Sequence, residues 1–530
     1  MWLLDALYKY RGSKRAAVIH NDETTSFGDL WKRSEAIAGF LESRHLADNK
    51  TPVVIYGNKE TDIIAVMHGA LKSGLAYVPV DTSYPLERLE KIMNQIGAQV
   101  LFNFSDIEVT RDGCQVVTAE QLHEIYEEYK DFLSNAQDWV ADDDICYILF
   151  TSGSTGEPKG VPIRKRNIVN FVEWARKFLI AQSDNSKIVM NQIAYSFDLS
   201  VTILYVYLSE GYTLYSIDKS DLNNMSVLFK ILRKSHLSAW VSTPSLTEIC
   251  CYDNEFNQQL LPNLRTFFFV GETLTKKVAG ELLQRFPSTH VINGYGPTEC
   301  TVAISACEIT EDMIEQEDSL PVGKLIDDAR ISLLNVTEQN QSTVGELAVV
   351  SKSTGNGYFN NEEKTRKAFW LDNDSGLHGY KTGDFVYIKN GLLYFIGRMD
   401  SQIKLNGFRI ELDDIAENLN KLNYISNSIV IPVKEDNIVK YLAAFIKLSQ
   451  QTELSNLKLL IKVKKDLGNL IPEYMVPKKI IVVDEFPLNV NGKIDRKKWL
   501  CHNKQLINSH FYRGVSELPY KLLFAVIYTH

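Results

Sequence analysis

Short apolar runs rich in β-branched residues alternate with stretches of helical periodicity along most of the chain. The run TPVVIYG (51–57) is followed by TDIIAVMHGALKSG (61–74) and then by AYVPVD (76–81). This order predicts strand, helix and strand, which is the repeating unit of a mainly parallel sheet. Similar apolar runs, each followed by a loop or a helical stretch, are QVLFNF, ICYILF, KIVMNQ, LSAWVS and LRTFFFVG.

From about residue 321 the pattern changes to strand-rich sequence with frequent turn residues, and Lys389-Asn390-Gly391 between two apolar runs predicts a hairpin turn. We therefore predict an α/β protein with a large domain over 1–398, whose β-rich subdomain covers about 321–398. A small α+β domain is predicted over 399–500. We assign no role to the C-terminal tail, residues 501–530.

Composition narrows the class of protein. Hydrophobic residues make up 45% of the 530 residues, which is enough for a large folded core, and the formal net charge of −9 argues against a nucleic-acid binder. Seven scattered cysteines form no CxxC pair. Neither a secretory signal nor an apolar run long enough to span a membrane is evident, so we expect a cytoplasmic enzyme without a membrane span.

The strongest local motif is TSGSTGEPKG (151–160), directly after the apolar run ICYILF. Small hydroxyl residues and glycines let backbone N–H groups close around phosphate oxygens, and Lys159 adds positive charge. The alternative is a flexible glycine-rich surface loop. The candidate phosphate-binding residues are Thr151, Ser152, Gly153, Ser154, Thr155, Gly156 and Lys159.

Three further motifs carry candidate chemistry. In NGYGPTE (293–299) a glycine-flanked aromatic can stack on a base, while Thr298 and Glu299 offer oxygen ligands for phosphate and Mg²⁺. In YKTGD (380–384) a carboxylate can accept both hydroxyls of a ribose. NGKIDR (491–496) places a lysine on a tight turn. Each motif also has a purely structural alternative. NGYGPTE could be a plain turn, the carboxylate of YKTGD could be a solvated surface charge, and NGKIDR could be an exposed Asn-Gly turn.

Together and in this order, these segments resemble the core motifs of the adenylate-forming superfamily, which includes acyl-CoA synthetases, luciferases and nonribosomal peptide synthetase adenylation domains. The resemblance covers about residues 20 to 500. Within the superfamily, the sequence is most similar to the family of D-alanine–carrier protein ligases. The segments that carry this likeness are YSFDLSV (195–201), STPS (242–245), Leu282 to Pro287 with GPTE (296–299), and SLPVG (319–323).

The resemblance implies ATP and Mg²⁺ as cofactors and assigns roles by motif. Lys493 would contact both the substrate carboxylate and the nucleotide, Glu299 would hold Mg²⁺, and Thr298 would act beside it. Asp400 would be the hinge about which the small, mobile domain turns. The residues implied to bind the nucleotide, besides the phosphate loop, are Gly271, Glu272, Asn293, Gly294, Tyr295, Gly296, Asp384 and Arg398.

An aspartate at the position of Asp198 binds the substrate ammonium in such enzymes, which implies an amino acid as substrate. Its structural alternative is a helix N-cap. The implied pocket is mostly apolar and suits a small side chain. The D-alanine ligases have a cysteine where this chain has Val270, so the hand of the amino acid stays open. The pocket residues are Asp198, Leu199, Thr202, Val241, Phe268, Val270, Gly294, Val302 and Ala303.

The implied activity is activation of a small amino acid, D-alanine or similar, as its adenylate, and transfer to the phosphopantetheine thiol of a separate carrier protein. Both teichoic-acid D-alanylation and natural-product assembly are compatible with it. One alternative is an acyl- or aryl-CoA synthetase for acids without an amine. A non-enzymatic nucleotide-binding protein is the other.

Overall fold

The computed structural model describes residues 2–46, 50–152, 157–180, 186–339, 342–398, 401–435, 438–450 and 454–486. These residues form two compact units, and each is described by itself. The first unit comprises residues 1–82, 92–150 and 160–396. The second comprises 83–91, 151–159 and the described residues from 397 onward.

A six-stranded sheet in the first unit has the order β6-β5-β3-β4-β7-β8. Its central strands pair in parallel, and β3 is buried along its whole length, as expected for β-branched residues covered on both faces. The strands are β3 (Val53–Tyr56), β4 (Tyr77–Val80), β5 (Val100–Asn103), β6 (Gln115–Thr118), β7 (Ile145–Thr151) and β8 (Lys159–Arg164). The helices in this part of the chain are α1 (Leu3–Tyr8), α2 (Phe27–Ser43), α3 (Thr61–Lys72), α4 (Leu86–Ile96), α5 (Ala119–Glu128) and α6 (Lys165–Leu179).

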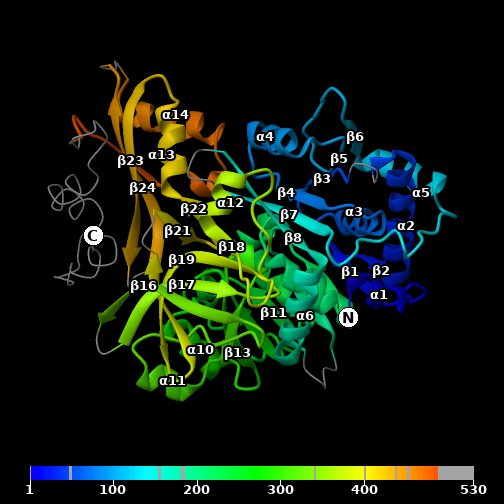
Figure 1. Ribbon diagram of the computed structural model, residues 1–530, viewed down its shortest axis with the longest axis horizontal. Coiled ribbons are helices and arrows are strands. Elements are labelled where there is room, and N and C mark those ends of the chain that lie inside the picture. Colours follow the sequence, from blue (N-terminus) through cyan, green and yellow to red (C-terminus); the bar gives the residue numbers. More distant parts are fainter. Residues whose placement is uncertain are drawn as a thin grey trace. The chain divides into compact units, whose positions relative to one another are not determined.

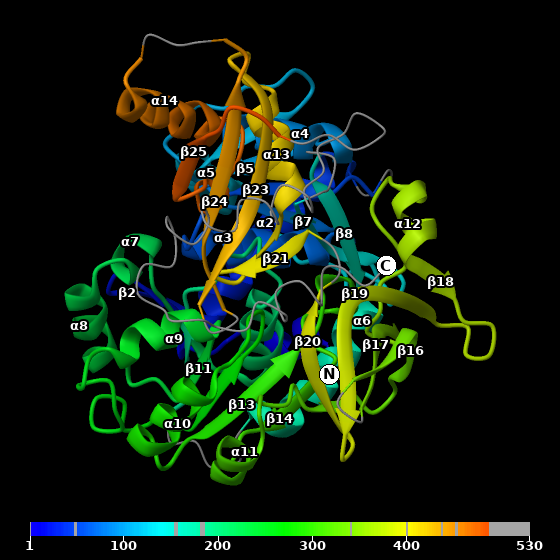
Figure 2. The same ribbon diagram turned by 90° about the vertical axis from the view of Figure 1, so that its left-hand side faces the viewer.

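A nine-stranded sheet follows, with the order β15-β14-β13-β12-β11-β9-β10-β1-β2. Figure 2 labels its strands β11, β13 and β14. From β13 to β1 every neighbouring pair is parallel, so the carboxyl ends of these strands lie along one edge. The strands are β1 (Ala16–His20), β2 (Glu23–Ser26), β9 (Ile188–Asn191), β10 (Thr213–Ser216), β11 (Ala239–Ser242), β12 (Thr266–Phe269), β13 (His290–Tyr295), β14 (Ser305–Glu308) and β15 (Lys324–Leu325). The helices are α7 (Lys219–Leu222), α8 (Met225–Ser235), α9 (Pro244–Cys251), α10 (Lys276–Arg285) and α11 (Glu311–Gln316).

The strand-rich stretch forms a third sheet, with the order β16-β17-β19-β18 and β20 paired with β19. Asn390 and Gly391, with φ of 53° and 76°, make the turn between β19 and β20, which confirms the predicted hairpin. The elements are β16 (Arg330–Gln339), β17 (Ser342–Val350), α12 (Glu362–Ala368), β18 (Phe369–Leu371), β19 (His378–Lys389) and β20 (Leu392–Arg398) (Figure 1).

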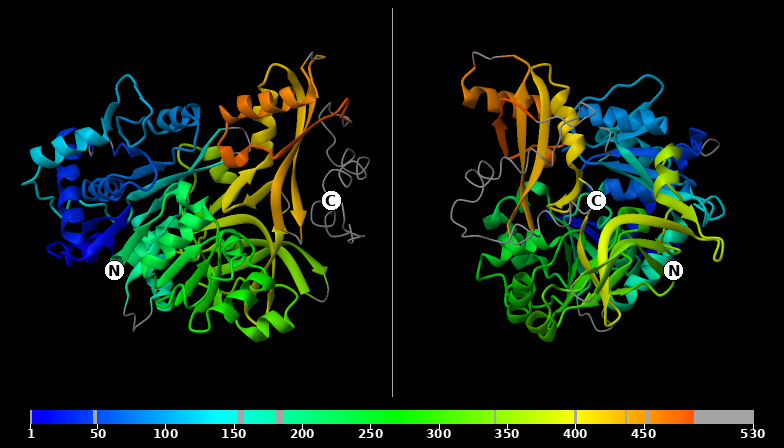
Figure 3. Two further views of the ribbon diagram at one scale, coloured as in Figure 1. Left: turned by 180° about the vertical axis from the view of Figure 1, so that it is seen from behind. Right: turned by 60° about the vertical axis from the view of Figure 1, so that its left-hand side comes forward.

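In the second unit, two helices and a strand hairpin build a separate core (Figure 3, yellow to orange). The long hairpin of β23 and β24 pairs in parallel with β25 through β24. Asn406 and Gly407 make a second tight turn, with φ of 52° and 84°. The elements are β21 (Gln402–Leu405), β22 (Phe408–Glu411), α13 (Leu412–Asn420), β23 (Ile425–Glu435), β24 (Ile438–Leu448), α14 (Asn456–Gly468) and β25 (Lys479–Val482).

The predicted fold class is thus confirmed: parallel sheets with helices, a β-rich part, and an α+β unit toward the end of the chain. Within the described ranges, no helix has the length and apolarity needed to cross a lipid bilayer. The domain boundaries given above from the sequence stay a prediction.

Candidate active site

Most of the candidate site residues in the first unit lie near the carboxyl ends of strands of the nine-stranded sheet or in the loops that follow them. Asp198 follows β9, Val241 lies within β11, Phe268 and Val270 lie at the end of β12, and Asn293 lies in β13. Ligands in open parallel sheets bind outside this edge, because the loops that leave it are free to diverge and carry side chains. The topology therefore gathers residues that lie far apart in the sequence.

Asp198 is held by a residue of the NGYGPTE motif. The Thr298 Oγ1 donates a hydrogen bond of 2.6 Å to Asp198 Oδ2, and the Asp198 side chain is only 6% exposed. A hydrogen bond to an ionised acceptor in a nearly dry setting is stronger than a neutral one, and it fixes the direction of the carboxylate. The structure thus joins the predicted ammonium ligand to Thr298, which the sequence had placed beside phosphate and metal.

Glycine shapes the wall beside this pair. The strand register places Val241 opposite Phe268, and a Cβ added at Gly294 would lie 2.9 Å from the Phe268 ring and 3.0 Å from Val270 Cγ2. Only a residue without a side chain fits there. The predicted pocket residues that are fully or almost fully buried are Leu199, Thr202, Val241, Phe268, Val270, Val302 and Ala303.

A strained turn carries the last two of these residues. Thr301 and Val302 both have positive φ, 55° and 69°, which is an uncommon conformation for β-branched residues. Thr301 is secured by a 2.7 Å hydrogen bond from its Oγ1 to the Ser353 carbonyl, and a Cβ at Gly296 would meet the Ala303 backbone at 2.6 Å. Such strain persists only where surrounding contacts hold it, and it concentrates at functional sites.

Two buried hydroxyls near Asp198 were not expected from the sequence in this arrangement. Thr202 begins a π-helix over Thr202–Tyr207, and its Oγ1 has no hydrogen-bond partner among the described residues. The Tyr147 hydroxyl likewise has none there. Burial, reinforced by the neighbouring Tyr77 and by Asp198, raises the pKa of Tyr147 well above its usual value, so this hydroxyl stays protonated. π-Helical turns are frequent at functional sites, but no sequence pattern announces this one.

Tyr295 and Asp384, both predicted to contact adenosine, touch each other. The Tyr295 hydroxyl donates a short hydrogen bond to Asp384 Oδ2, and Asp384 is 2% exposed. The backbone N–H of Asp384 donates to Thr382 Oγ1 at 3.0 Å. An aromatic face and a carboxylate anchored at one place suit a base and its ribose.

Glu299 is completely buried, and its partner was missed by the sequence reasoning. The Tyr358 hydroxyl donates to Glu299 Oε1 at 2.9 Å and lies 3.3 Å from the Tyr380 hydroxyl. In the described part of the chain, no three or more His, Cys, Asp or Glu side chains lie together in a way that could hold a metal ion. A lone carboxylate still fits Mg²⁺, because this ion usually takes one or two carboxylates and completes its shell with phosphate oxygens and water.

The other predicted nucleotide residues of this unit serve as anchors. Asn293 Nδ2 donates to the Pro321 carbonyl at 2.8 Å, while its Oδ1 is buried with no hydrogen-bond partner among the described residues. Glu272 accepts hydrogen bonds from the backbone and the hydroxyl of Ser245, at the start of α9. Gly271 before it has φ of 103°, which a side chain rarely tolerates.

Four of the predicted residues that the structure describes lie in the second unit. Ser152 Oγ donates to the Arg409 carbonyl at 2.8 Å and accepts from the Glu411 N–H at 3.1 Å, so β22 holds this end of the predicted phosphate loop. Thr151, Lys159 and Arg398 belong to the same unit. Gly153, Ser154, Thr155, Gly156, Asp400 and Lys493 lie outside the described residues, and their assigned roles stay predictions.

Comparison with known proteins shows which enzymes this chain resembles. A family model described as AMP-binding enzyme matches residues 7–359, and one described as AMP-binding enzyme C-terminal domain matches residues 414–493. The chain is 36% identical over 504 residues to a D-alanine--D-alanyl carrier protein ligase of Bacillus cytotoxicus, which covers 94% of this chain and 99% of that protein.

Two solved structures share the fold. The Vibrio cholerae adenylation domain AlmE, in complex with glycyl-adenosine-5'-phosphate, matches with a TM-score of 0.78 and 20% identity over 96% of this chain and 97% of that one. The o-succinylbenzoate CoA synthetase MenE from Bacillus subtilis also gives 0.78, with 19% identity over 93% and 97%. At these identities the likeness concerns the fold alone.

Proposed function

Because the chain belongs to the AMP-binding enzyme family, we propose that it is an AMP-forming ligase that activates a small amino acid with ATP and transfers it to a carrier protein. The observation that carries the proposal is the buried Asp198 carboxylate, oriented by Thr298 against an apolar wall. A desolvated carboxylate favours a substrate with an ammonium group and rejects one that leaves the charge unpaired.

The amino acid is proposed to be small. Phe268 and Val270 reach the space that a Cβ at Gly294 would occupy, so this wall of the proposed pocket is closely packed and suits a small side chain. D-alanine is the substrate in the name of the Bacillus cytotoxicus relative, and glycine is the acyl group bound to AlmE. We assign D-alanine or an amino acid of similar size, and leave its hand to experiment.

Activation requires the amino-acid carboxylate to attack the α-phosphorus of ATP and expel pyrophosphate. The protein contributes position and charge to such a reaction more than covalent chemistry. Asp198 would hold the ammonium group, and Tyr295 with Asp384 would hold the adenosine. Glu299 would bind Mg²⁺, which neutralises charge on the phosphates, and Tyr358 keeps the Glu299 carboxylate oriented.

The second step is proposed to be attack of a phosphopantetheine thiol on the adenylate carbonyl, which forms a thioester and releases AMP. The carrier would be a separate protein, as the name of the relative indicates. Lys493 is proposed to act in the first step and Asp400 to be the hinge between steps, both from the resemblance. The reaction is placed in the cytoplasm, where ATP is plentiful.

A CoA synthetase for acids without an amine is the alternative, and the MenE likeness shows that the fold accommodates such enzymes. Amino-acid-dependent exchange of pyrophosphate into ATP separates the two. The panel contains D- and L-amino acids, glycine and simple carboxylates, each tested for product with carrier protein and with CoA. Exchange with D-alanine or a similar amino acid and product on the carrier supports the proposal. Exchange with simple carboxylates alone and product on CoA would refute it.

A further inference from the structure

A fully enclosed lysine lies outside the set of residues that the sequence motifs single out. Lys59 lies between β3 of the six-stranded sheet and α3, two residues before the helix begins, and is 4% exposed. Its ammonium group reaches the nine-stranded sheet of the same unit, where it contacts the end of β9 and the loop that follows it. A buried cation is costly unless oxygen atoms surround it, so its contacts are informative.

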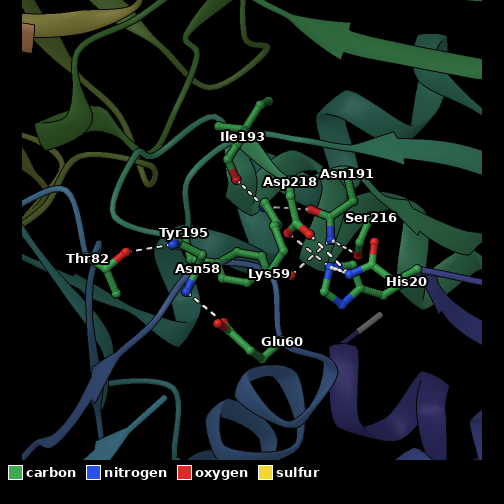
Figure 4. Close-up of polar contacts among 11 residues, drawn as sticks. His20, Asn58, Lys59, Glu60, Thr82, Asn191, Ile193, Tyr195, Ser216 and Asp218 are labelled. Atoms are coloured by element: carbon green, nitrogen blue, oxygen red, sulfur yellow. Dashed lines mark hydrogen bonds and ion pairs between the residues drawn. The ribbon is translucent and has the colours of Figure 1, made fainter. Parts of the chain in front are cut away.

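The partners of Lys59 come from one short segment of that loop (Figure 4). The Nζ donates a 3.2 Å hydrogen bond to Asn191 Oδ1 and a short one to the Ile193 carbonyl. It also lies 3.8 Å from the centre of the Tyr195 ring, a favourable position for a cation over an aromatic face. One side chain thus contacts three residues within five positions of the chain.

Nearby carboxylates do not form an ion pair with Lys59 in the described part of the chain. Asp218 is engaged by His20, at 2.9 Å from Nε2 to Oδ1, and by Asn21 at 3.1 Å. Asp81, Asp218 and Glu60 nevertheless act on the lysine through space. Burial outweighs their attraction and lowers the pKa of Lys59 to about 7. An ion pair therefore does not explain its placement, whereas the loop contacts do.

The loop that Lys59 holds leads directly to Asp198. Asn191 Nδ2 donates to the Tyr195 hydroxyl and to Ser216 Oγ, each at 2.9 Å, so the start of the loop is tied on both sides. Past Tyr195 the chain closes a turn through the Phe197 N–H and the Ala194 carbonyl at 2.9 Å. Asp198 is the next residue, so only a short, hydrogen-bonded stretch of backbone connects it to the residues that Lys59 contacts.

We infer that Lys59 is a positioning residue for the proposed reaction: by tying Asn191, Ile193 and Tyr195 to the neighbouring sheet, it sets the place from which Asp198 binds the substrate ammonium. This inference rests on the proposed function of Asp198. It assigns a specificity role to a residue whose contacts are with the loop that leads to Asp198. Because Lys59 contacts no residue of the proposed adenosine site, its loss affects amino-acid binding selectively.

A second buried lysine in the same helix region provides the control. Lys72 ends α3, is 1% exposed, forms a 2.9 Å ion pair with Glu35 and lies 3.2 Å from the centre of the Trp31 ring. A helix of this length separates the two lysines by about 18 Å. Lys72→Met therefore removes the same buried ammonium group without touching the Asp198 loop.

The test compares wild type, Lys59→Met, Asn191→Ala and Lys72→Met as full-length proteins. Pyrophosphate exchange gives KM for the amino acid and for ATP separately, and amide hydrogen exchange reports residues 192–198 without any need for activity. We expect Lys59→Met to raise the amino-acid KM about tenfold, with the ATP KM unchanged, since loss of the hydrogen bonds from Nζ to Asn191 and Ile193 frees the loop. Exchange of the loop amides is expected to accelerate by a similar factor. Asn191→Ala reproduces both changes, and Lys72→Met neither.

Equal KM changes for both substrates, or loop exchange in Lys59→Met that matches wild type, would overturn the inference. If Lys59→Met does not fold, Asn191→Ala decides by the same two readouts. Failure of the proposed function can be told apart from failure of this inference. In that case wild type would show no amino-acid-dependent pyrophosphate exchange, while amide hydrogen exchange would still report whether Lys59 holds the loop. Loop amides that stay protected in both variants would reject the positioning role whatever the substrate is.

Discussion

Replacing Asp198 by asparagine separates the charge of this side chain from its shape. Asparagine retains an oxygen that can accept the 2.6 Å hydrogen bond from Thr298, so the local structure should persist. The missing feature is the negative charge that would face the substrate ammonium. Because the side chain is 6% exposed, water screens the lost interaction little.

The magnitude follows from the strength of hydrogen bonds between charged groups. Such a bond contributes about 1.5 to 3 kcal/mol, which corresponds to about 10- to 150-fold in affinity. We expect Asp198→Asn to weaken amino-acid binding within this range, toward the upper end because of burial. Binding of ATP should be unchanged.

Pyrophosphate exchange with each substrate varied in turn measures the two effects. Asp384→Asn is the matched control: it removes an equally buried carboxylate that accepts from Tyr295, and it should raise the KM for ATP and leave the amino-acid KM unchanged. An unchanged amino-acid KM in Asp198→Asn, or parallel increases for both substrates in either variant, would refute the assignment of these two carboxylates.

Four further changes have expected outcomes. Tyr358→Phe should raise the KM for Mg-ATP several-fold, because Glu299 loses its orienting donor; steady-state kinetics at varied Mg²⁺ check this, and unaltered kinetics would contradict it. Tyr147→Phe removes a buried hydroxyl with no partner among the described residues and should stabilise the protein by about 1 kcal/mol in urea unfolding, whereas a loss of stability would show that the hydroxyl is satisfied. Lys493→Ala should abolish adenylate formation but spare thioester transfer from supplied adenylate, and equal loss in both steps would oppose its assigned role. Between about pH 7 and 10 the unfolded chain binds the Lys59 proton that the folded chain has released, so stability rises with pH over this window; Lys59→Met should reduce that slope in pH-dependent unfolding, and an unchanged slope would count against the lowered pKa.

The sequence predicted those features that local patterns control. Runs of β-branched residues followed by helical periodicity gave the parallel strands, because such strands are covered on both faces and need no polar alternation. The Asn-Gly pair at 390–391 predicted the hairpin because both residues tolerate positive φ. The strand order could not be predicted from local patterns, because the sheet pairs strands that are far apart in the sequence. For example, β1 lies between β10 and β2.

The contacts that orient the site come from tertiary packing and have no local signal. Thr298 and Asp198 are 100 residues apart, and Tyr358 reaches Glu299 from 59 residues away. Lys59 lies 132 residues from Asn191 and follows a strand of a different sheet. The motifs showed which residue types carry the chemistry, but only the folded chain shows which of them hold one another.

In the proposed reaction, this chain joins the carboxylate of an amino acid to the α-phosphorus of ATP. An amino acid whose carboxylate carries heavy oxygen, incubated with ATP, Mg²⁺ and carrier protein, tests this by mass spectrometry of the released nucleotide. We expect one labelled oxygen in AMP and none in pyrophosphate, because the attacking carboxylate oxygen stays on the α-phosphorus when the thiol takes the acyl group. Unlabelled AMP, or label in inorganic phosphate alongside ADP, would contradict it.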